Sequence, residues 1–483
     1  MDMNNLLFKS LLLGFVLNSC DENAINKNRI QTNVLFIAVD DLRTNIGAYG
    51  DSIAITPNID KLSQSGLTFD RAYCQMAVCG PSRSSDLTGM YPDQIGVTDL
   101  STHFRIKQPN VITLPQIFKI NGYEALTIGK IFHARKSAQD SISLSSPPIL
   151  NLGIKKEQYL LDKNRTGKKA YATEAVDTLD EGYWDGKIAK HAVNALKKFK
   201  NSGKPFFLGV GFMKPHLPFS APKKYWAKYN RERDFILRNR NRPIGAPNIA
   251  FHDSNELRGY TDIGRNIISL KKEKQLWHGY YASTTYTDYQ IGRVINALDS
   301  LNMRDNTLIV FWSDHGYHLG EQGFWCKSSN YELDIRVPLI ISHPSIHVKR
   351  IDQIVELVDI YPTIIDFCKI EEKTPLSGKS LLNLIGKNKT KWTNYAFNQF
   401  GRPYEAALSG KGKTHEGYSV RGKKFRLTLW FNYINGKIEK RELYDMSEGI
   451  EKKNISGEKV YKEVEEELTR LVLNYKKQKY LKR

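Results

Sequence analysis

Three separate stretches of the chain are almost continuously apolar, and polar side chains follow each of them at once. The stretches are Asn33–Val39, Phe206–Phe212 and Thr307–Trp312. A strand that is apolar on both faces is typical of a parallel sheet covered by helices. Sheets of this kind bind their ligands at the carboxyl ends of the strands. The pattern therefore predicts an α/β fold with its functional site at those strand ends.

The residues that follow these strands are suited to chemistry. Asp40 and Asp41 follow the first strand, His216 follows the second, and Asp314 and His315 follow the third. Adjacent carboxylates repel each other unless a cation lies between them. A histidine has a pKa near neutrality, so it can donate a proton to a leaving alcohol. Taken singly, each of these segments is also consistent with a solvated loop.

The most specific motif is Cys79-Gly80-Pro81-Ser82-Arg83. Alone, such a segment is also typical of a turn around a small buried thiol. It resembles the Cys-x-Pro-Ser-Arg signature of type I sulfatases, in which the cysteine is oxidised to formylglycine and the hydrated aldehyde is the nucleophile. A helix is expected to start after Ser82, which would bring its N-terminus near the nucleophile and favour an anionic sulfate.

The resemblance implies one bound Ca²⁺ ion. Its ligands would be three carboxylates, one imidazole and the nucleophile: Asp40, Asp41, Asp314, His315 and an oxygen derived from Cys79. Carboxylate oxygens are hard donors that suit Ca²⁺. The imidazole of His315 is softer and leaves Zn²⁺ or Mn²⁺ open as alternatives.

The resemblance also assigns roles to residues outside the ligand set. It implies contacts with the sulfate and the nucleophile for Arg83, Lys130, His133 and Lys327. Lys214-Pro215-His216-Leu217-Pro218 is similar to the iduronate-2-sulfatase-like branch of the family, and His216 is its expected general acid. His133 is the expected base that removes a proton from the second hydroxyl of the nucleophile.

The fold implied by the resemblance is that of alkaline phosphatase, with a mixed, mostly parallel sheet flanked by helices. Residues 33–387 would form this catalytic domain. From about residue 388 the pattern changes to short alternating strands, which predicts a small antiparallel sheet in a subdomain over 388–483. Helical spacing predicts helices over 184–200 and 280–298, and one is expected over 460–473 that packs on the small sheet. Residues 356–365 resemble a late core helix of the family.

The N-terminus reads as an export signal. Leu6–Ser19 is apolar apart from Lys9 and is too short to span a membrane. Val16-Leu17-Asn18-Ser19-Cys20 resembles a bacterial lipobox, so residues 1–20 are expected to be a lipoprotein signal peptide with Cys20 lipidated. Residues 21–32 would be a tether. The expected location is outside the cytoplasm, in the periplasm or at the cell surface, anchored to a membrane; ordinary secretory cleavage is the alternative.

The charge of the chain limits its partners. The 483 residues carry a net charge of +20, which favours polyanions such as a sulfated glycan. A general enrichment in lysine explains the same number. Motifs for nucleic-acid binding are missing from the sequence, so nucleic acid is not an expected partner. The 5 cysteines are scattered and do not form a disulfide framework.

These observations together predict an exported sulfatase that hydrolyses sulfate esters of a sulfated polysaccharide or its oligosaccharides, such as ulvan or a glycosaminoglycan. A formylglycine-generating enzyme is an expected partner. One alternative is a phosphonate monoester or phosphodiester hydrolase with the same nucleophile. Another is a surface lipoprotein that binds polyanions without catalysis and keeps Cys79 as a thiol.

Overall fold

The computed structural model describes residues 31–134, 138–149, 155–386 and 392–478. The predicted lipidation site at Cys20 lies outside the described residues. The strands of the main sheet are β1 Asn33–Val39, β2 Leu67–Tyr73, β3 Glu124–Gly129, β5 Phe206–Phe212, β7 Thr307–Ser313, β10 Arg336–Val337, β11 Leu339–Ser342 and β12 Lys349–Glu356. Two short strand pairs join β4 Thr173–Val176 to β6 Phe219–Pro222 and β8 His318–Leu319 to β9 Trp325–Cys326.

The helices are as follows. They are α2 Pro57–Ser63, α3 Cys79–Thr88, α4 Pro92–Ile95, α5 Phe104–Lys107, α6 Leu114–Ile120, α7 Trp184–Ser202, α8 Lys223–Trp226, α9 Arg231–Asp234, α10 Asn255–Arg258, α11 Leu270–Ser300, α12 Glu332–Ile335, α13 Ile360–Cys368, α14 Tyr404–Ser409 and α15 Lys462–Gln478. None of these described helices is both long and apolar enough to cross a membrane.

The main sheet is mixed and mostly parallel, as predicted. In the described part of the chain its order is β10-β2-β11-β7-β1-β5-β3, with β12 beside β2. β7, β1, β5 and β3 are mutually parallel, and β11 runs antiparallel between β7 and β2. Val39 lies opposite both Phe212 and Ser313, so the residues that follow β1, β5 and β7 emerge side by side.

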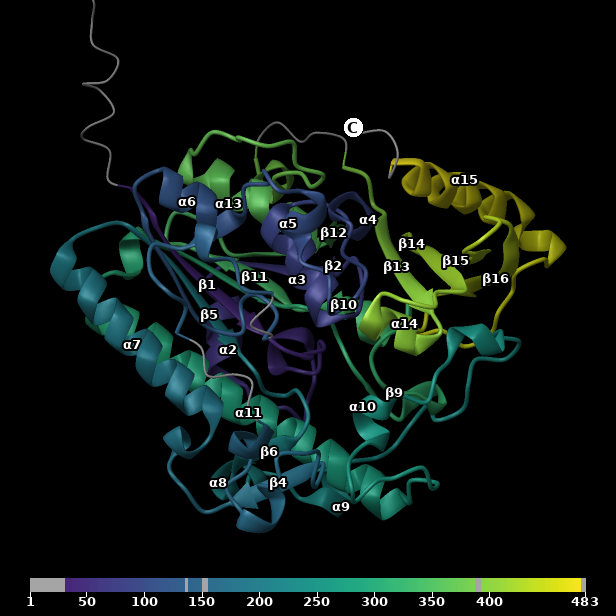
Figure 1. Cartoon of the computed structure of the whole chain (residues 1–483), viewed down its shortest axis with the longest axis horizontal. Coiled ribbons are helices and arrows are strands. Elements are labelled where there is room, and N and C mark those ends of the chain that lie inside the picture. The colour runs from purple at the N-terminus through teal and green to yellow at the C-terminus, as the bar shows by residue number, and fades with distance from the viewer. Residues whose placement is uncertain (1–30, 135–137, 150–154, 387–391, 479–483) are drawn as a thin grey trace, which may run out of the picture. The chain divides into compact units, whose positions relative to one another are not determined.

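Helices cover both faces of this sheet because β1 is apolar on both. Phe36 packs with side chains of α6 and α13, among them Phe118 and Ile364. Ile37, which points to the opposite face, packs in the core formed with α7 and α11. Figure 1 shows α7 and α11 crossing the same face of the sheet. The parallel strands are therefore buried from both sides, as their sequences predicted.

The predicted antiparallel sheet is also present. It has the order β13-β14-β15-β16, formed by β13 Ala396–Arg402, β14 His415–Arg421, β15 Phe425–Asn432 and β16 Ile438–Asp445. Leu468 and Val472 of α15 pack on one of its faces. Figure 1 shows α15 beside β14, β15 and β16.

Three predicted helix boundaries were wrong. α3 begins at Cys79 rather than after Ser82, because proline is tolerated in the first turn of a helix. The helix expected over 356–365 is α13, Ile360–Cys368, and Glu356 instead ends strand β12. α11 begins at Leu270, ten residues before the predicted start, since Ser269 caps it with a hydrogen bond from the amide of Lys272.

Candidate active site

The residues that follow β1 and β7 lie next to each other, because these two parallel strands are neighbours in the sheet. The amide of Asp41 donates to Oδ1 of Asp314 at 3.2 Å, and the amide of His315 donates to the same oxygen at 3.0 Å. Asp41 has a φ of 62°, a left-handed conformation that few residues other than glycine adopt. Its carbonyl accepts a hydrogen bond from the hydroxyl of Tyr280. Tertiary contacts thus hold an unfavourable turn that brings both carboxylates into one place.

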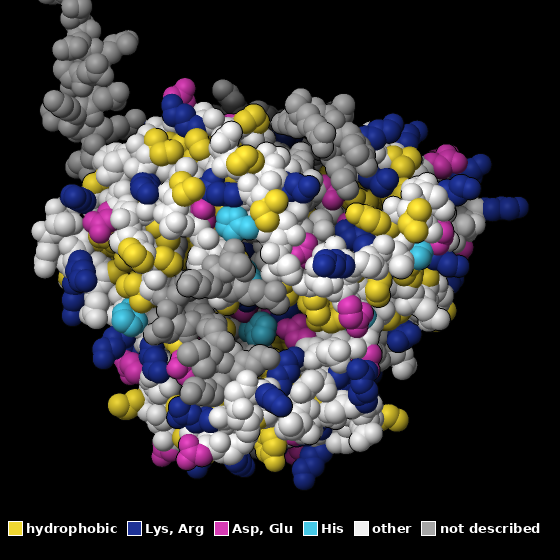
Figure 2. All heavy atoms as spheres, in the orientation of Figure 1, with side chains coloured by type: hydrophobic (Ala, Val, Ile, Leu, Met, Phe, Trp, Pro, Cys, Tyr) yellow, Lys and Arg dark blue, Asp and Glu magenta, His cyan; other side chains and the backbone are white. Residues whose placement is uncertain are grey.

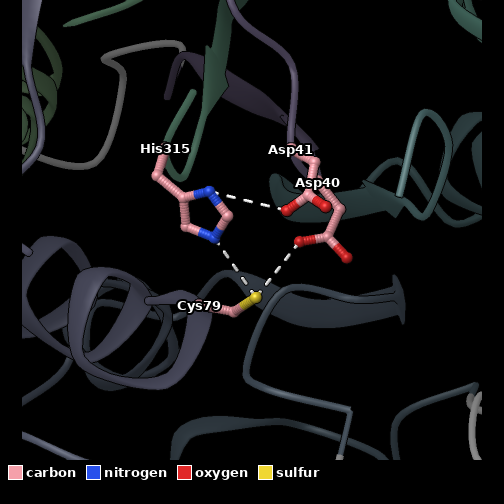
Figure 3. A group of neighbouring side chains, drawn as sticks. All are labelled: Asp40, Asp41, Cys79 and His315. Carbon is pink, nitrogen blue, oxygen red and sulfur yellow. Dashed lines mark hydrogen bonds and ion pairs between the residues drawn. The ribbon is translucent and has the colours of Figure 1, made fainter. Parts of the chain in front are cut away.

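The thiol of Cys79 meets these carboxylates at the first turn of α3. Its Sγ lies 3.4 Å from Oδ1 of Asp40 and 3.3 Å from Nε2 of His315, and Nδ1 of His315 lies 3.5 Å from Oδ1 of Asp41 (Figure 3). These four side chains are buried, and each offers an atom within 4.8 Å of the others, a spacing that could hold a metal ion. The structure therefore brings together residues that lie up to 275 positions apart in the sequence, as Asp40 and His315 do.

Asp314, the fifth predicted ligand, adjoins this group. Its Oδ2 lies 3.7 Å from Nε2 of His315 and accepts a hydrogen bond of 2.8 Å from Nε of Arg83. Arg83 also donates to the carbonyl of Lys130, which connects α3 to the end of β3. Arg83 therefore joins three segments of the site through one buried guanidinium.

Three cations lie against the carboxylates. Nζ of Lys130 donates to Oδ2 of Asp40, and Nζ of Lys327 lies 2.7 and 3.0 Å from the two oxygens of Asp41. Burial alone would raise the pKa of Asp40, but the charges of Lys130 and other cations outweigh burial and hold that pKa well below its usual range. Burial prevails at Asp41, whose pKa is raised despite Lys327.

The thiol itself is held in its neutral form. Burial, with the negative charge of Asp40 added, raises the pKa of Cys79 well above its ordinary value. A thiol acts as a nucleophile or a metal ligand only as a thiolate. The unmodified Cys79 is therefore poorly suited to either task, although its position is central.

His216 lies at the exposed side of this group. Its side chain is 26% exposed, and Nε2 lies 3.9 Å from Oδ2 of Asp41 and 3.2 Å from Oε1 of Glu256. The ammonium of Lys214 donates to the carbonyls of His216 and Pro218, and so holds the loop from beneath. Burial lowers the pKa of Lys214 to about 8.

His133 occupies a different place. It lines a small cavity beside the first turn of α3, together with Gly80, Arg83 and Phe132. Its predicted role in removing a proton from the nucleophile stays a prediction.

The sequence interpretation missed Glu256. This residue lies in the polar segment 230–269, in which the sequence analysis identified no site residue. Its carboxylate accepts hydrogen bonds from Lys327 at 2.6 Å and lies against His216. No motif surrounds Glu256, so nothing in the sequence could have separated it from the other acidic residues of that segment.

The positive charge on the face drawn in Figure 2 is not gathered in one place. Figure 2 shows Lys and Arg side chains over the whole of the visible face, without a single basic stripe. The cations that contact the site carboxylates are instead buried, since Arg83, Lys130 and Lys327 are at most 5% exposed. The charge of the site is therefore set by a few buried side chains and not by the net charge of +20.

Comparison with known proteins gives the family. Residues 32–370 match the Sulfatase family, and residues 320–478 match the family described as N-sulphoglucosamine sulphohydrolase, C-terminal. Iduronate 2-sulfatase from Homo sapiens is 32% identical over 88% of this chain and 90% of its own length. A protein named sulfatase from Formosa agariphila is 31% identical over 81% of this chain and 80% of its own.

Solved structures share the fold. The phosphonate monoester hydrolase of Silicibacter pomeroyi has a TM-score of 0.76 at 21% identity, and covers 93% of this chain and 96% of its own. A protein solved in complex with its substrate D-glucosamine-2-N,6-O-disulfate has a TM-score of 0.72 at 24% identity, with 93% and 98% covered. These likenesses, at low identity, show the fold alone. The family match covers most of the chain, and by it this chain belongs to the Sulfatase family and is a sulfuric ester hydrolase.

Proposed function

We propose that the protein hydrolyses sulfate esters of a sulfated polysaccharide or its oligosaccharides, through a nucleophile made from Cys79. The observation that carries this proposal is the contact of Cys79 with Asp40 and His315 at the ends of adjacent strands. The names of two relatives, iduronate 2-sulfatase and sulfatase, agree with a sulfated saccharide as substrate. Ulvan and the glycosaminoglycans are the two classes of glycan that we propose to test.

Conversion of Cys79 to formylglycine fits this pocket. The raised pKa of the thiol leaves Cys79 unreactive as it stands. The hydrated aldehyde supplies an oxygen nucleophile, and this oxygen is small and uncharged enough to replace the thiol beside Asp40. A sulfatase-maturing enzyme is therefore a proposed partner.

A divalent cation also fits the pocket. Asp40, Asp41, Asp314 and His315 would hold it, and their mostly oxygen donor set favours Ca²⁺. The bound ion supplies positive charge against the oxygens of the sulfate group.

The other residues act on charge and protons. Arg83, Lys130 and Lys327 present three buried cations that neutralise charge growing on sulfate oxygens. His216 would give the leaving alcohol its Nε2 proton from the doubly protonated ring, because Nδ1 lies 2.6 Å from the carbonyl oxygen of Leu217 and donates to it in either form. His133 is the proposed base that removes the proton from the second hydroxyl of the nucleophile. The sulfate then leaves and the aldehyde forms again.

We further propose that the enzyme is an exported lipoprotein with Cys20 as its lipid attachment site, that residues 33–387 form its catalytic domain and that 388–483 form a subdomain. Metabolic labelling with a radioactive fatty acid tests the anchor. Wild type should be labelled and a Cys20→Ser variant should not. Label on both proteins, or on neither, would contradict the proposal.

The decisive experiment combines mass spectrometry with a substrate panel. After expression with a maturing enzyme, the Cys79 peptide should carry the aldehyde mass, and the enzyme should release sulfate from defined oligosaccharides of ulvan or of glycosaminoglycans. Faster turnover of phosphonate esters than of any sulfate ester would favour the phosphonate hydrolase alternative. An unconverted thiol together with glycan binding and no turnover would favour the non-catalytic binder.

A further inference from the structure

Glu256 is shared by two side chains of the proposed mechanism. Its Oε1 lies 2.6 Å from Nζ of Lys327 and 3.2 Å from Nε2 of His216. Its side chain is only 13% exposed. Burial would raise the pKa of Glu256, but the charges of Lys327 and His216 outweigh burial and keep that pKa well below its usual range. Glu256 is therefore an ionised acceptor at the mouth of the site.

The segment around Glu256 holds Lys327 at both ends. The ring of His252 contacts the backbone carbonyl oxygen of Lys327 through Nε2 at 2.7 Å. Burial and the nearby charge of Arg402 lower the pKa of His252 to about 3, so the ring is neutral and donates from Nε2. Four residues later, Glu256 binds the ammonium group of the same lysine. A segment that grips a lysine at its backbone and at its charged end fixes the whole side chain.

The position of Glu256 matters because Asp41 both pairs with Lys327 and is a proposed ligand of the cation. The ammonium of Lys327 lies between Asp41 and Glu256, at 2.7 and 2.6 Å from the nearest oxygen of each. A cation held by Asp41 would compete with Lys327 for the oxygens of that carboxylate. Glu256 is not among the proposed ligands, so it can keep the ammonium in place when Asp41 turns to the cation.

Glu256 also orients His216. Nδ1 of His216 points to the carbonyl oxygen of Leu217, and Nε2 points to Glu256. Two acceptors, one at each nitrogen, fix the plane of the doubly protonated ring, and its Nε2 faces Glu256 at the mouth of the site. This arrangement resembles the carboxylate partners that orient histidines elsewhere in proteins.

We propose that Glu256 is a positioning residue for the sulfate-ester hydrolysis proposed above, on which this inference rests. It holds the ammonium of Lys327 toward the sulfate and the Nε2 proton of His216 toward the leaving oxygen. It acts through these two residues. Its loss should matter most where the leaving group needs a proton.

The test compares two leaving groups. Glu256→Gln keeps the size of the side chain and removes its charge. We expect kcat for a sugar sulfate, whose alkoxide leaves poorly, to fall about 100-fold, and kcat for 4-nitrophenyl sulfate to fall only about 10-fold. Glu256→Asp keeps the charge and should recover part of the loss on the sugar sulfate. Glu232→Gln, an exposed carboxylate ion-paired with Lys274 in the same segment, is the matched control and should behave as wild type.

A double-mutant cycle separates positioning from damage. In a His216→Ala background, Glu256→Gln should no longer distinguish the two leaving groups. Equal losses on both substrates in the wild-type background, or no loss, would overturn the inference. If Glu256→Gln melts well below wild type, Glu256→Asp carries the same comparison, because a displaced carboxylate should still penalise the sugar sulfate more. Wild type that cleaves no sulfate ester at all would instead refute the proposed function.

Discussion

Two clusters of buried charge in this protein use the same residue types for different ends. The strand-end cluster is the set of carboxylates and cations at Asp40, Asp41, Asp314, Arg83, Lys130 and Lys327. The inter-sheet cluster is the set at Glu332, Glu451, Arg421 and Arg426, which joins α12 to the antiparallel sheet. Both lie almost wholly out of water. Burial and ion pairing therefore do not by themselves distinguish a functional site from a cluster that only stabilises the fold.

In the inter-sheet cluster every carboxylate faces a guanidinium. Oε2 of Glu332 lies 2.6 Å from Nη2 of Arg426 and 3.0 Å from Nε of Arg421, while Nε of Arg426 lies 2.9 Å from Oε1 of Glu451. The two arginines outweigh burial and lower the pKa of Glu332 to about 2. The backbone carbonyl of Asn330 accepts a hydrogen bond of 2.8 Å from Nη1 of Arg426. Opposite charges alternate, so the cluster needs no further ion.

In the strand-end cluster two carboxylates are neighbours in sequence and in space. The pKa of Asp40 is lowered while that of Asp41 is raised, although the two residues are adjacent and equally buried. Two carboxylates held side by side repel each other, and a bound cation can relieve this repulsion. The comparison teaches that adjacent carboxylates with pKa values shifted in opposite directions, and not buried charge as such, distinguish the strand-end cluster from the inter-sheet cluster.

The largest expected effect tests the nucleophile. Cys79→Ala should lower kcat/KM for a sulfate ester by at least ~10⁴-fold, because it removes the proposed nucleophile. The melting temperature should stay within a few degrees of wild type, since the lost thiol is small. Cys368→Ala, which removes a thiol in α13, is the control and should retain full activity. Substantial turnover by Cys79→Ala would contradict the mechanism.

The next effect concerns stability and tests the inter-sheet cluster. Arg426→Met leaves Glu332 and Glu451 buried with fewer partners, so the free energy of unfolding should fall by about 3–5 kcal/mol. Urea unfolding measures this difference. The activity per folded molecule should change little, because Arg426 contacts no residue of the strand-end cluster. A loss of kcat with unchanged stability would show that the two clusters are not separate.

Removal of the cation should act on the strand-end cluster alone. Chelation by EDTA is expected to lower kcat/KM about 100-fold, and added Ca²⁺ should restore it. Ca²⁺ should also raise the melting temperature of wild type, because it binds only the folded protein. Asp41→Asn should lose this rise, while Asp352→Asn, which changes an exposed carboxylate paired with Arg71, should keep it. An equal rise in all three proteins would place the ion elsewhere.

The sequence predicted most of the main sheet and the residues gathered at the ends of its strands. Continuous apolar runs identify β1, β5 and β7, because burial on both faces leaves a signal within each strand. Polar residues after each run then point to one site, since parallel strands end on the same side. These signals are local, and the chemistry they predict follows from the common direction of the strands.

What the sequence did not show depends on distant pairing. Nothing in Leu339–Ser342 reveals that β11 runs antiparallel between β7 and β2. The role of Glu256 depends likewise on a loop that brings α10 to Lys327, 71 positions later. The start of α3 was predicted after Ser82 and lies instead at Cys79, because the first turn of a helix accepts Pro81. Local patterns thus predict elements, while contacts between loops need the fold.

A third group, of buried carboxyl groups, sharpens the comparison, because no ion pair among the described residues reaches it and only the more distant charge of Lys379 acts on Asp359. Glu356 accepts hydrogen bonds from the hydroxyl of Tyr91 and the amide of Phe397, and Asp359 accepts one from the amide of Glu356. Burial, with repulsion from Asp359 added, raises the pKa of Glu356 to about 8, and burial raises that of Asp359 to about 6.

The smallest expected effect is the pH dependence that this pair produces. The folded protein keeps protons on Glu356 and Asp359 at pH values where the unfolded chain has lost them. Stability is therefore greatest below the unfolded pKa values and falls as the pH rises through 6 and then 8. Between pH 6.5 and pH 8 we expect a loss of about 2 kcal/mol, measured by urea unfolding. Glu356→Gln mimics the protonated group and should flatten this slope, whereas Glu448→Gln, which is 72% exposed, should not. If both variants keep the wild-type slope, Glu356 and Asp359 are not the source of the pH dependence.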